Sequence, residues 1–361
     1  MSELTAASKY MHFWYPQIPE WCTVLFFFVI INLVNLAHVK LFGEMEFWFA
    51  LIKVVAILCM IVFGLYILIS GSGGELSSPA NLWQYGGFFA KGAYGVFISL
   101  AIVMFSFGGL ELVGIAAAEA DNPQKTIPKA VNQVLYRILI FYFGAIIILI
   151  CLYPWPMLAN NIDQSDWAAY MQASPFVLIF KYIGKDLAAH ILNFVVLTAA
   201  LSVYNSSVYC NSRMLFGLAL QNNAPRALTR LNANEVPIVA IFVSSSCTLF
   251  CVFLSYKAPQ EALGILMSLV VASLVLNWAM ISLTHMKFRK SMIAKKQNII
   301  FKALWYPLGN YLCLAFIALI YVNIYLLDMK TSVYMAPLWV LLVWAGYKVK
   351  LALHKTKSKT Q

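Results

Sequence analysis

The sequence predicts an all-α polytopic membrane protein with about nine transmembrane helices. Of its 361 residues, 62% are hydrophobic and only 11% are charged, a balance that is too apolar for a soluble globular domain. A helix needs about 20 mostly apolar residues to cross a bilayer. Nine stretches reach or approach this length: residues 21–39, 45–69, 93–118, 134–153, 187–204, 236–256, 262–283, 304–327 and 333–347.

The basic residues support this set of spans. The formal net charge of +11 could suggest a nucleic-acid partner, but when the connectors are assigned to alternate sides of a membrane, eighteen of the 25 basic residues fall on one side and six on the other, with Lys53 inside a span. Cytoplasmic loops carry such an excess of lysine and arginine. We therefore expect a lipid bilayer and no nucleic acid as partner, and a cytoplasmic C-terminus.

Sequence signatures of enzymes and metal sites are absent. The seven cysteines lie mostly within the spans and show neither CxxC nor Cys/His ligand spacing, and the five histidines are scattered. The HExxH, P-loop and GxSxG patterns do not occur, so we expect no catalytic residue, no metal ligand and no cofactor.

One segment interrupts the third apolar stretch. Phe105-Ser106-Phe107-Gly108-Gly109-Leu110-Glu111 places two glycines and a carboxylate within it. Glycine weakens a helix by roughly 1 kcal/mol relative to alanine, and an ionisable group at bilayer depth costs on the order of 3 kcal/mol or more. A discontinuous helix that lines a polar site would explain both features. Close packing of neighbouring helices against the small glycines is the alternative.

The connector that follows, residues 119–129, lies on the basic side. Thr126 and Pro128 can start a helix there, because a proline in the first turn gives up no needed hydrogen bond. The connector is either a capped cytoplasmic elbow or the hinge of an inner gate.

Four segments resemble bacterial amino-acid permeases of the amino acid/polyamine/organocation superfamily. They are VKLFGEMEFWFALIK at 39–53, FSFGGLELVG at 105–114, AAEADNP at 117–123 and VYNSSVYCNSRMLFG at 203–217. The aromatic amino-acid permeases, for phenylalanine, tyrosine and tryptophan, are the most similar subgroup. The resemblance extends over essentially the whole chain.

This resemblance implies a twelve-span transporter built on a five-plus-five inverted repeat, of which the chain would keep spans 4–12 and would be truncated at its N-terminus. Residues 1–20 would be the remnant of span 3 and an outer loop. Residues 21–69 would form two spans of the incomplete first repeat, residues 93–303 the second repeat with its broken helix near 105–111, and residues 304–361 two C-terminal spans with a basic cytoplasmic tail.

The resemblance also implies a site. In transporters of this architecture, substrate binds near the midplane between two broken helices. The substrate ammonium would meet the carbonyls of Phe105, Ser106 and Phe107, beside Gly108 and Gly109. The substrate carboxylate would meet a half-helix that in the family belongs largely to span 1, which is not among the spans 4–12 that the chain keeps.

Two ionisable residues are candidates for proton coupling or gating. Glu111 is either a proton-sensitive carboxylate or a structural acceptor for nearby backbone donors. Lys53 resembles the buried lysine that replaces a coupling cation in some members of the superfamily, or it reaches the cytoplasmic interface along its aliphatic stem. Ser202 and Asn205 could face Lys53 in support, or could only join helices by hydrogen bonds.

Three functions follow as hypotheses. The first is proton-coupled import of aromatic amino acids across a bacterial inner membrane, driven by the proton gradient, with the amino acid and the proton as partners. The second is a truncated, non-transporting membrane protein or interaction partner. The third, a membrane enzyme, is disfavoured because the spans hold no catalytic pairing. The sequence predicts no oligomeric state.

Overall fold

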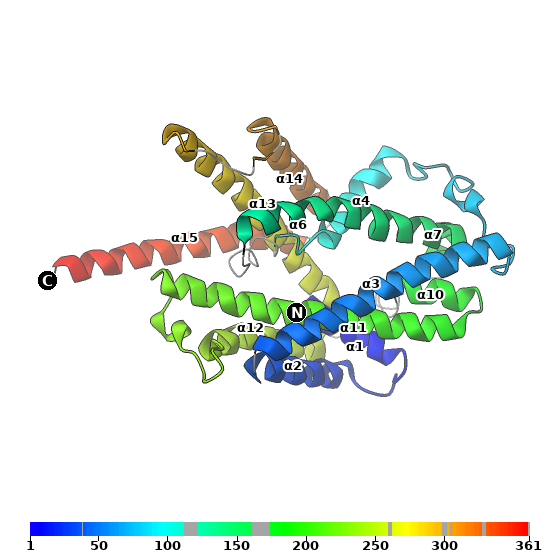
Figure 1. Ribbon diagram of the computed structural model, residues 1–361, viewed down its shortest axis with the longest axis horizontal. Coiled ribbons are helices and arrows are strands. Elements are labelled where there is room, and N and C mark those ends of the chain that lie inside the picture. Colours follow the sequence, from blue (N-terminus) through cyan, green and yellow to red (C-terminus); the bar gives the residue numbers. More distant parts are fainter. Residues whose placement is uncertain are drawn as a thin grey trace. The chain divides into compact units, whose positions relative to one another are not determined.

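The computed structural model describes residues 1–37, 39–111, 122–160, 174–258, 262–297, 302–303, 305–326 and 330–359. All regular elements in these ranges are helices (Figure 1). The α-helices in these ranges are α1 (Ser2–His12), α2 (Glu20–Ala37), α3 (Val39–Ser70), α4 (Gly92–Ser106), α6 (Pro123–Arg137), α7 (Ala145–Leu152), α8 (Trp155–Asn160), α10 (Pro175–Tyr182), α11 (Asp186–Leu220), α12 (Ile238–Lys257), α13 (Ala262–Ala294), α14 (Leu308–Leu326) and α15 (Lys330–Lys359).

The predicted all-α polytopic membrane fold is confirmed. Seven described helical segments are long and apolar enough to cross a membrane, and α15 adds a shorter apolar segment, Val333–Lys348. Each corresponds to one of the predicted stretches. The remaining predicted stretch, 93–118, begins as α4, which ends at Ser106. The last residues of this stretch, 112–118, lie outside the described ranges.

Several helices, α11 and α13 among them, run further than their apolar stretches. α11 continues to Leu220, sixteen residues beyond the predicted end, and α13 continues to Ala294. Hydrophobicity marks the part of a helix that lipid surrounds, whereas backbone hydrogen bonding continues through the polar residues that follow. The stretches therefore located the spans but underestimated the length of the helices.

The chain folds as two compact units, which we describe separately. The first consists mainly of Met1–Ala90 and Lys129–Leu263, and the second mainly of Lys91–Glu111 and Gly264–Gln361. The boundaries predicted for the two repeats rest on the family resemblance and stay predictions.

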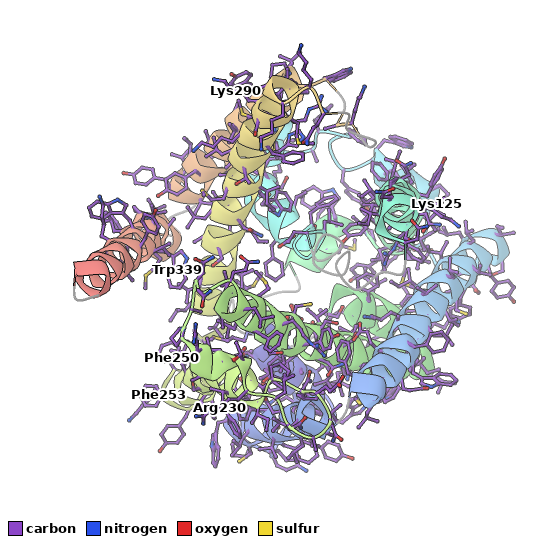
Figure 2. The ribbon with its side chains drawn as sticks, turned by 60° about the vertical axis from the view of Figure 1, so that its left-hand side comes forward. Lys125, Arg230, Phe250, Phe253, Lys290 and Trp339 are labelled. Carbon is purple, nitrogen blue, oxygen red and sulfur yellow. The ribbon has the colours of Figure 1, made fainter. Side chains whose placement is uncertain are left out.

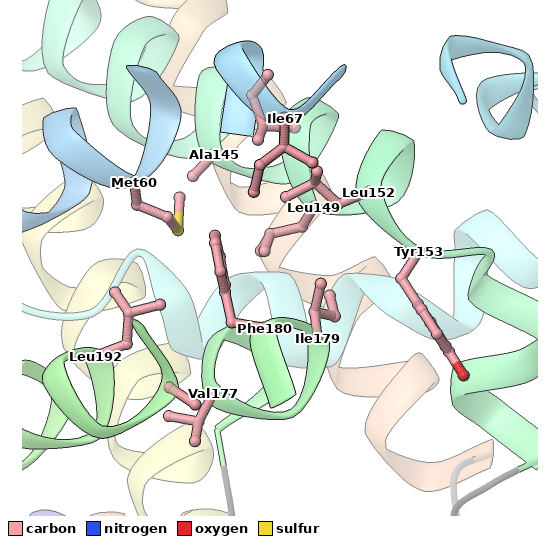
Figure 3. Packing of buried hydrophobic residues seen from close by; sticks show 12 residues of the cluster. Met60, Ile67, Ala145, Leu149, Leu152, Tyr153, Val177, Ile179, Phe180 and Leu192 are labelled. Carbon is pink, nitrogen blue, oxygen red and sulfur yellow. The ribbon is translucent and has the colours of Figure 1, made fainter. Parts of the chain in front are cut away.

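The long helix α11 organises the first unit. It packs against α1, α3, α10, α12 and α2. Figure 3 shows the core that forms where α3, α7 and α10 meet: the Phe180 ring of α10 lies among Met60, Leu149 and Leu192. Phe180 is fully buried and stacks on Phe63 of α3, with 6.0 Å between the ring centroids.

Helices α3 and α7 approach each other closely at Gly64. A Cβ atom at this position would lie only 2.3 Å from Cγ2 of Ile148. Small residues permit such approaches between membrane helices, whose packing depends on van der Waals contact. Gly64 therefore sets the separation of the two helices.

The loop after α3 covers the end of α7. Ser77 Oγ donates to the carbonyl of Leu152 at 2.8 Å, and the backbone N–H of Ser78 donates to the carbonyl of Cys151 at 2.8 Å. Asn81 Nδ2 reaches the same Cys151 oxygen at 3.1 Å. Carbonyls in the last turn of a helix lack intrahelical partners, so these three residues complete the end of α7.

Helix α4 leads the second unit, in which it packs against α14, and α14 packs against α15. Met104 of α4, Val271 and Val275 of α13, and Ile317 and Ile320 of α14 form its core. The Asn323 amide of α14 donates to the carbonyl of Phe97 in α4. This core fixes the carboxyl end of α4, where the interrupted segment begins.

Large apolar side chains cover the outer surfaces of the helices. Phe250 and Phe253 of α12 and Trp339 of α15 project away from their helices (Figure 2) and are 52%, 56% and 62% exposed. Exposed aromatic residues in such numbers are unfavourable in water. They are expected on helices surrounded by lipid, which agrees with the spans.

The structure corrects the predicted start of the helix after the interrupted segment. α6 begins at Pro123, before the predicted Thr126 and Pro128, and Pro128 lies inside it. The backbone N–H groups of Lys125 and Thr126 donate to the carbonyl of Asn122 at 3.1 and 3.0 Å. Pro123 occupies the first helical position, where a missing N–H costs nothing. Residues 112–121, including the first part of the predicted connector, lie outside the described ranges.

Candidate functional site

The interrupted segment ends a helix inside an apolar stretch. α4 stops at Ser106, and residues 107–111 form turns. The backbone N–H of Phe107 donates to the carbonyl of Met104 at 3.3 Å, and that of Gly108 donates to the carbonyl of Phe105 at 3.0 Å. The carboxyl end of a helix carries a partial negative charge, which favours a cation beyond it.

The two glycines act in different ways. A Cβ atom on Gly108 would lie 3.0 Å from a methyl carbon of Leu274 in α13 and 3.2 Å from the Phe105 carbonyl oxygen. Gly109 has a φ of +96°, a conformation that L side chains rarely adopt. Gly108 thus permits close packing, as one interpretation of the sequence expected, while Gly109 permits the chain to turn.

Glu111 folds back over this turn. Its Oε2 accepts hydrogen bonds from the backbone N–H of Gly109 at 3.1 Å and from Nε1 of Trp278 at 3.3 Å. Its Oε1 accepts from Nδ2 of Asn277 at 3.4 Å. This geometry is that of a structural acceptor, the alternative considered from the sequence.

The aromatic and hydroxyl side chains of the segment face different surroundings. Phe105 packs against the core of α13 and α14. The Ser106 hydroxyl donates to the carbonyl of Val103 at 2.7 Å. Phe107 is half-buried. Of the predicted substrate residues, Phe105 therefore contributes to packing in the second unit, and the backbone of 105–109 forms the turn.

A groove of about 520 Å³ runs from Glu111 along α13 and α14. It is lined by Leu110, Trp278, His285 and Asn310, among others. Nδ2 of Asn310 donates to both the carbonyl and the hydroxyl of Ser282 at 3.2 Å, and its side chain also meets Nδ1 of His285. This polar group was not predicted from the sequence, because single polar residues in an apolar helix carry no recognisable motif.

The first unit holds the second group of candidate residues. Lys53 Nζ donates to Ser202 Oγ at 2.8 Å, and Ser202 Oγ donates to Oε1 of Glu46 at 2.9 Å. Ser202, on α11, is fully buried. Lys53 lies twelve residues after the start of the Leu41–Ser70 span, about 18 Å along the helix. Its ammonium thus points towards α11, whereas the alternative interpretation placed it at the interface.

Asn205 differs from the expectation that it faces Lys53. Its Oδ1 accepts a hydrogen bond from Nδ2 of Asn35 in α2 at 2.8 Å. One turn towards the N-terminus of α2, the Asn32 amide donates to Tyr204 Oη at 2.9 Å and accepts from the Ser245 hydroxyl. Position 205 lies about one turn beyond Ser202 on α11, and its side chain bonds to α2 and not to Lys53 of α3. Asn205 joins helices, which is the alternative the sequence allowed.

Glu46 is the residue of this network that analysis of the sequence passed over. Its spacing of seven residues from Lys53 places both on one face of α3, two turns apart. That spacing is the signal that could have identified it.

The helix end at 105–111 and the network of Glu46, Lys53 and Ser202 both place polar groups within apolar spans, as a membrane transporter requires. A family model described as "Amino acid permease" matches residues 1–360. The chain belongs to the amino acid permease family. The predicted family resemblance is thereby confirmed, and amino-acid transport, with no enzymatic activity, is the function of this family.

Several relatives of this permease are known by name. The Aromatic amino acid transport protein AroP of Escherichia coli (strain K12) is 54% identical over 353 residues, which cover 97% of this chain and 74% of the relative. AroP of Salmonella typhimurium (strain LT2) is 53% identical over 99% of this chain and 76% of the relative. The Amino-acid permease AapA of Bacillus subtilis (strain 168) is 41% identical over 99% of this chain and 76% of the relative.

Proposed function

We propose that this permease imports the aromatic amino acids phenylalanine, tyrosine and tryptophan together with protons across a bacterial inner membrane. The observation that carries the proposal is the end of α4 at Ser106 within an apolar stretch. Relatives named for aromatic amino-acid transport share 53–54% of aligned residues with this chain, which supports the choice of substrate.

The ammonium group of the substrate would bind at the carboxyl end of α4. Carbonyl oxygens have two lone pairs, so those of Phe105, Ser106 and Phe107 can accept from an ammonium while they take part in the turn. Gly108 and Gly109 keep this backbone free of side chains on the approach. The partial negative charge of the helix end adds to the attraction.

Two groups would respond to protons. Glu111 accepts a hydrogen bond from the backbone of the turn itself, so a change in its protonation would alter the substrate-binding backbone. Lys53 carries its charge at mid-depth of α3 and is bound to Ser202. An ionisable group inside a membrane segment is costly and usually functional, and a proton gradient would then drive uptake.

Uptake of labelled amino acids tests this proposal. Cells without aromatic amino-acid uptake of their own, expressing only this chain, should accumulate phenylalanine, tyrosine and tryptophan. An uncoupler or the substitution Glu111→Ala should abolish accumulation, whereas labelled lysine should not enter. Uptake equal to that of cells with an empty vector, despite normal amounts of the protein in the membrane, would instead support a non-transporting membrane protein.

A further inference from the structure

One face of α3 holds an acid and a base on either side of a single serine. Glu46 and Lys53 are separated by seven residues, or about 10 Å along the helix axis. Ser202 of α11 lies between them, 2.8 Å from Lys53 Nζ and 2.9 Å from Glu46 Oε1. The serine hydroxyl therefore bridges two groups of opposite charge that do not themselves meet.

The hydrogen bonds of this bridge all point in one direction. The lysine donates to the serine oxygen, and the serine proton is donated to the carboxylate. Ser202 is fully buried. The second carboxylate oxygen of Glu46, Oε2, is also buried and has no hydrogen-bond partner among the residues that the structure describes. A buried acceptor without a donor is unfavourable.

We propose that Ser202 and Glu46 form a relay that receives the proton of Lys53. In the transfer, an N–H bond of the Lys53 ammonium breaks as a new O–H bond forms on Ser202. The original O–H bond of Ser202 breaks as an O–H bond forms on Glu46. The products are a neutral amine and a neutral carboxylic acid, and the serine regains its original composition. This inference rests on the proposed role of Lys53 in proton coupling.

The position of Glu46 gives the relay a direction. Glu46 is five residues from the start of the Leu41–Ser70 span, whereas Lys53 is twelve residues from it. Lys40, which precedes this span, belongs to the basic side that the sequence assigns to the cytoplasm. The relay would therefore lead from mid-membrane towards the cytoplasm, the direction in which an importer must release its proton.

Other charged groups act on the ends of the relay. Glu3 of α1 attracts and Arg137 at the end of α6 repels the charge of Lys53. One turn before Glu46, Phe42 stacks on Tyr209 of α11, whose ring also contacts Arg213. The Ser202 hydroxyl connects the donor to the acceptor.

The relay can be tested with the full chain reconstituted in liposomes, with phenylalanine as the probe. The liposomes contain a pH-sensitive dye that reports internal acidification. Gradient-driven uptake requires net proton release inside, whereas counterflow of labelled against unlabelled phenylalanine does not. Glu46→Gln and Ser202→Ala should each reduce gradient-driven uptake and internal acidification at least about tenfold, and leave counterflow within about twofold of the unsubstituted chain.

Two further variants serve as controls. Ser202→Thr keeps the hydroxyl and should therefore retain gradient-driven uptake and internal acidification. Glu44→Gln removes an exposed carboxylate from the same helix and should change neither.

Each other outcome has a defined meaning. Coupled uptake that persists in Glu46→Gln or Ser202→Ala would overturn the relay. Loss of counterflow together with uptake in both variants would show a structural role and would also overturn it. If the unsubstituted chain accumulates phenylalanine without internal acidification, the proposed proton coupling itself is wrong. Elution of each variant as a single species in detergent establishes that it is folded.

Discussion

At the scale of single residues, the adjacent glycines of the turn differ in what they require. Gly109 needs a left-handed backbone, while Gly108 needs space beside Leu274. The first requirement cannot be met by any L side chain without strain. The second can be met in part if the Leu274 side chain moves.

Alanine substitutions distinguish these requirements. Gly109→Ala should lower stability by about 1–2 kcal/mol because of its backbone conformation, and Gly108→Ala by about 1–3 kcal/mol because of crowding. Apparent thermal midpoints of the purified chain in detergent measure both. In a Leu274→Ala background, Gly108→Ala should cause a smaller further loss than in the unsubstituted chain, whereas the loss caused by Gly109→Ala should be unchanged.

Gly346→Ala provides the control. This glycine of α15 has open space at its Cβ position, so alanine should leave the midpoint unchanged or raise it. A Gly109→Ala midpoint equal to that of the unsubstituted chain would contradict the assigned strain.

The sequence singled out the residues of the interrupted segment but did not predict their contacts. The glycines and Glu111 stand out because each is costly inside an apolar stretch, a local property that any sequence displays. The Trp278 and Asn277 partners of Glu111 come from α13, more than 160 positions away. No local pattern encodes such a pairing, which depends on how the helices pack.

At the scale of elements, the core between α3, α7 and α10 depends on one aromatic side chain. Phe180 is fully buried in the cluster (Figure 3) and comes from α10, a helix of only eight residues. A helix this short is not stable by itself. Its position therefore depends on the packing of Phe180 against Phe63 and Met60.

Replacement of buried and exposed phenylalanines tests this dependence. Phe180→Ala should destabilise the chain by about 3–5 kcal/mol, since it leaves a cavity where the ring lay. The matched change Phe250→Ala, at an exposed position on α12, should have a small effect because lipid replaces the lost contacts. Thermal midpoints in detergent compare the two, and equal losses would contradict the packing role of Phe180.

The elements themselves were predicted with uneven success. The seven long spans were found because lipid demands continuous hydrophobicity. The start of α6 was placed three residues too late, because Pro123 and Pro128 both satisfy the rule for a first-turn proline. Short helices such as α10 fall below the length that the apolar pattern can detect, and the contacts of α11 decide their position.

At the scale of the whole molecule, the basic residues predict how the chain crosses the membrane. The tail after position 347 contains five lysines, which should hold it in the cytoplasm. The loop between α3 and α4 should lie outside.

Reporter fusions measure this topology. Green fluorescent protein attached after Gln361 should fluoresce, whereas alkaline phosphatase at the same site should be inactive. Alkaline phosphatase inserted at Gly87, in the loop after α3, should be active. The reverse pattern would invert the predicted orientation, and with it the direction of the proposed relay.

The span between Gln124 and Leu152 contains a change of helical register. Residues Ile138–Gly144 form a π-helical segment between α6 and α7, and such a segment adds a residue to the turn. One residue rotates a helix face by about 100°, so the polar and apolar sides of α6 do not continue along α7. A single-residue deletion within Ile138–Gly144 would turn the Ile148 face of α7 away from Gly64. The number of residues in this segment, more than their identity, therefore fixes which face of α7 meets α3.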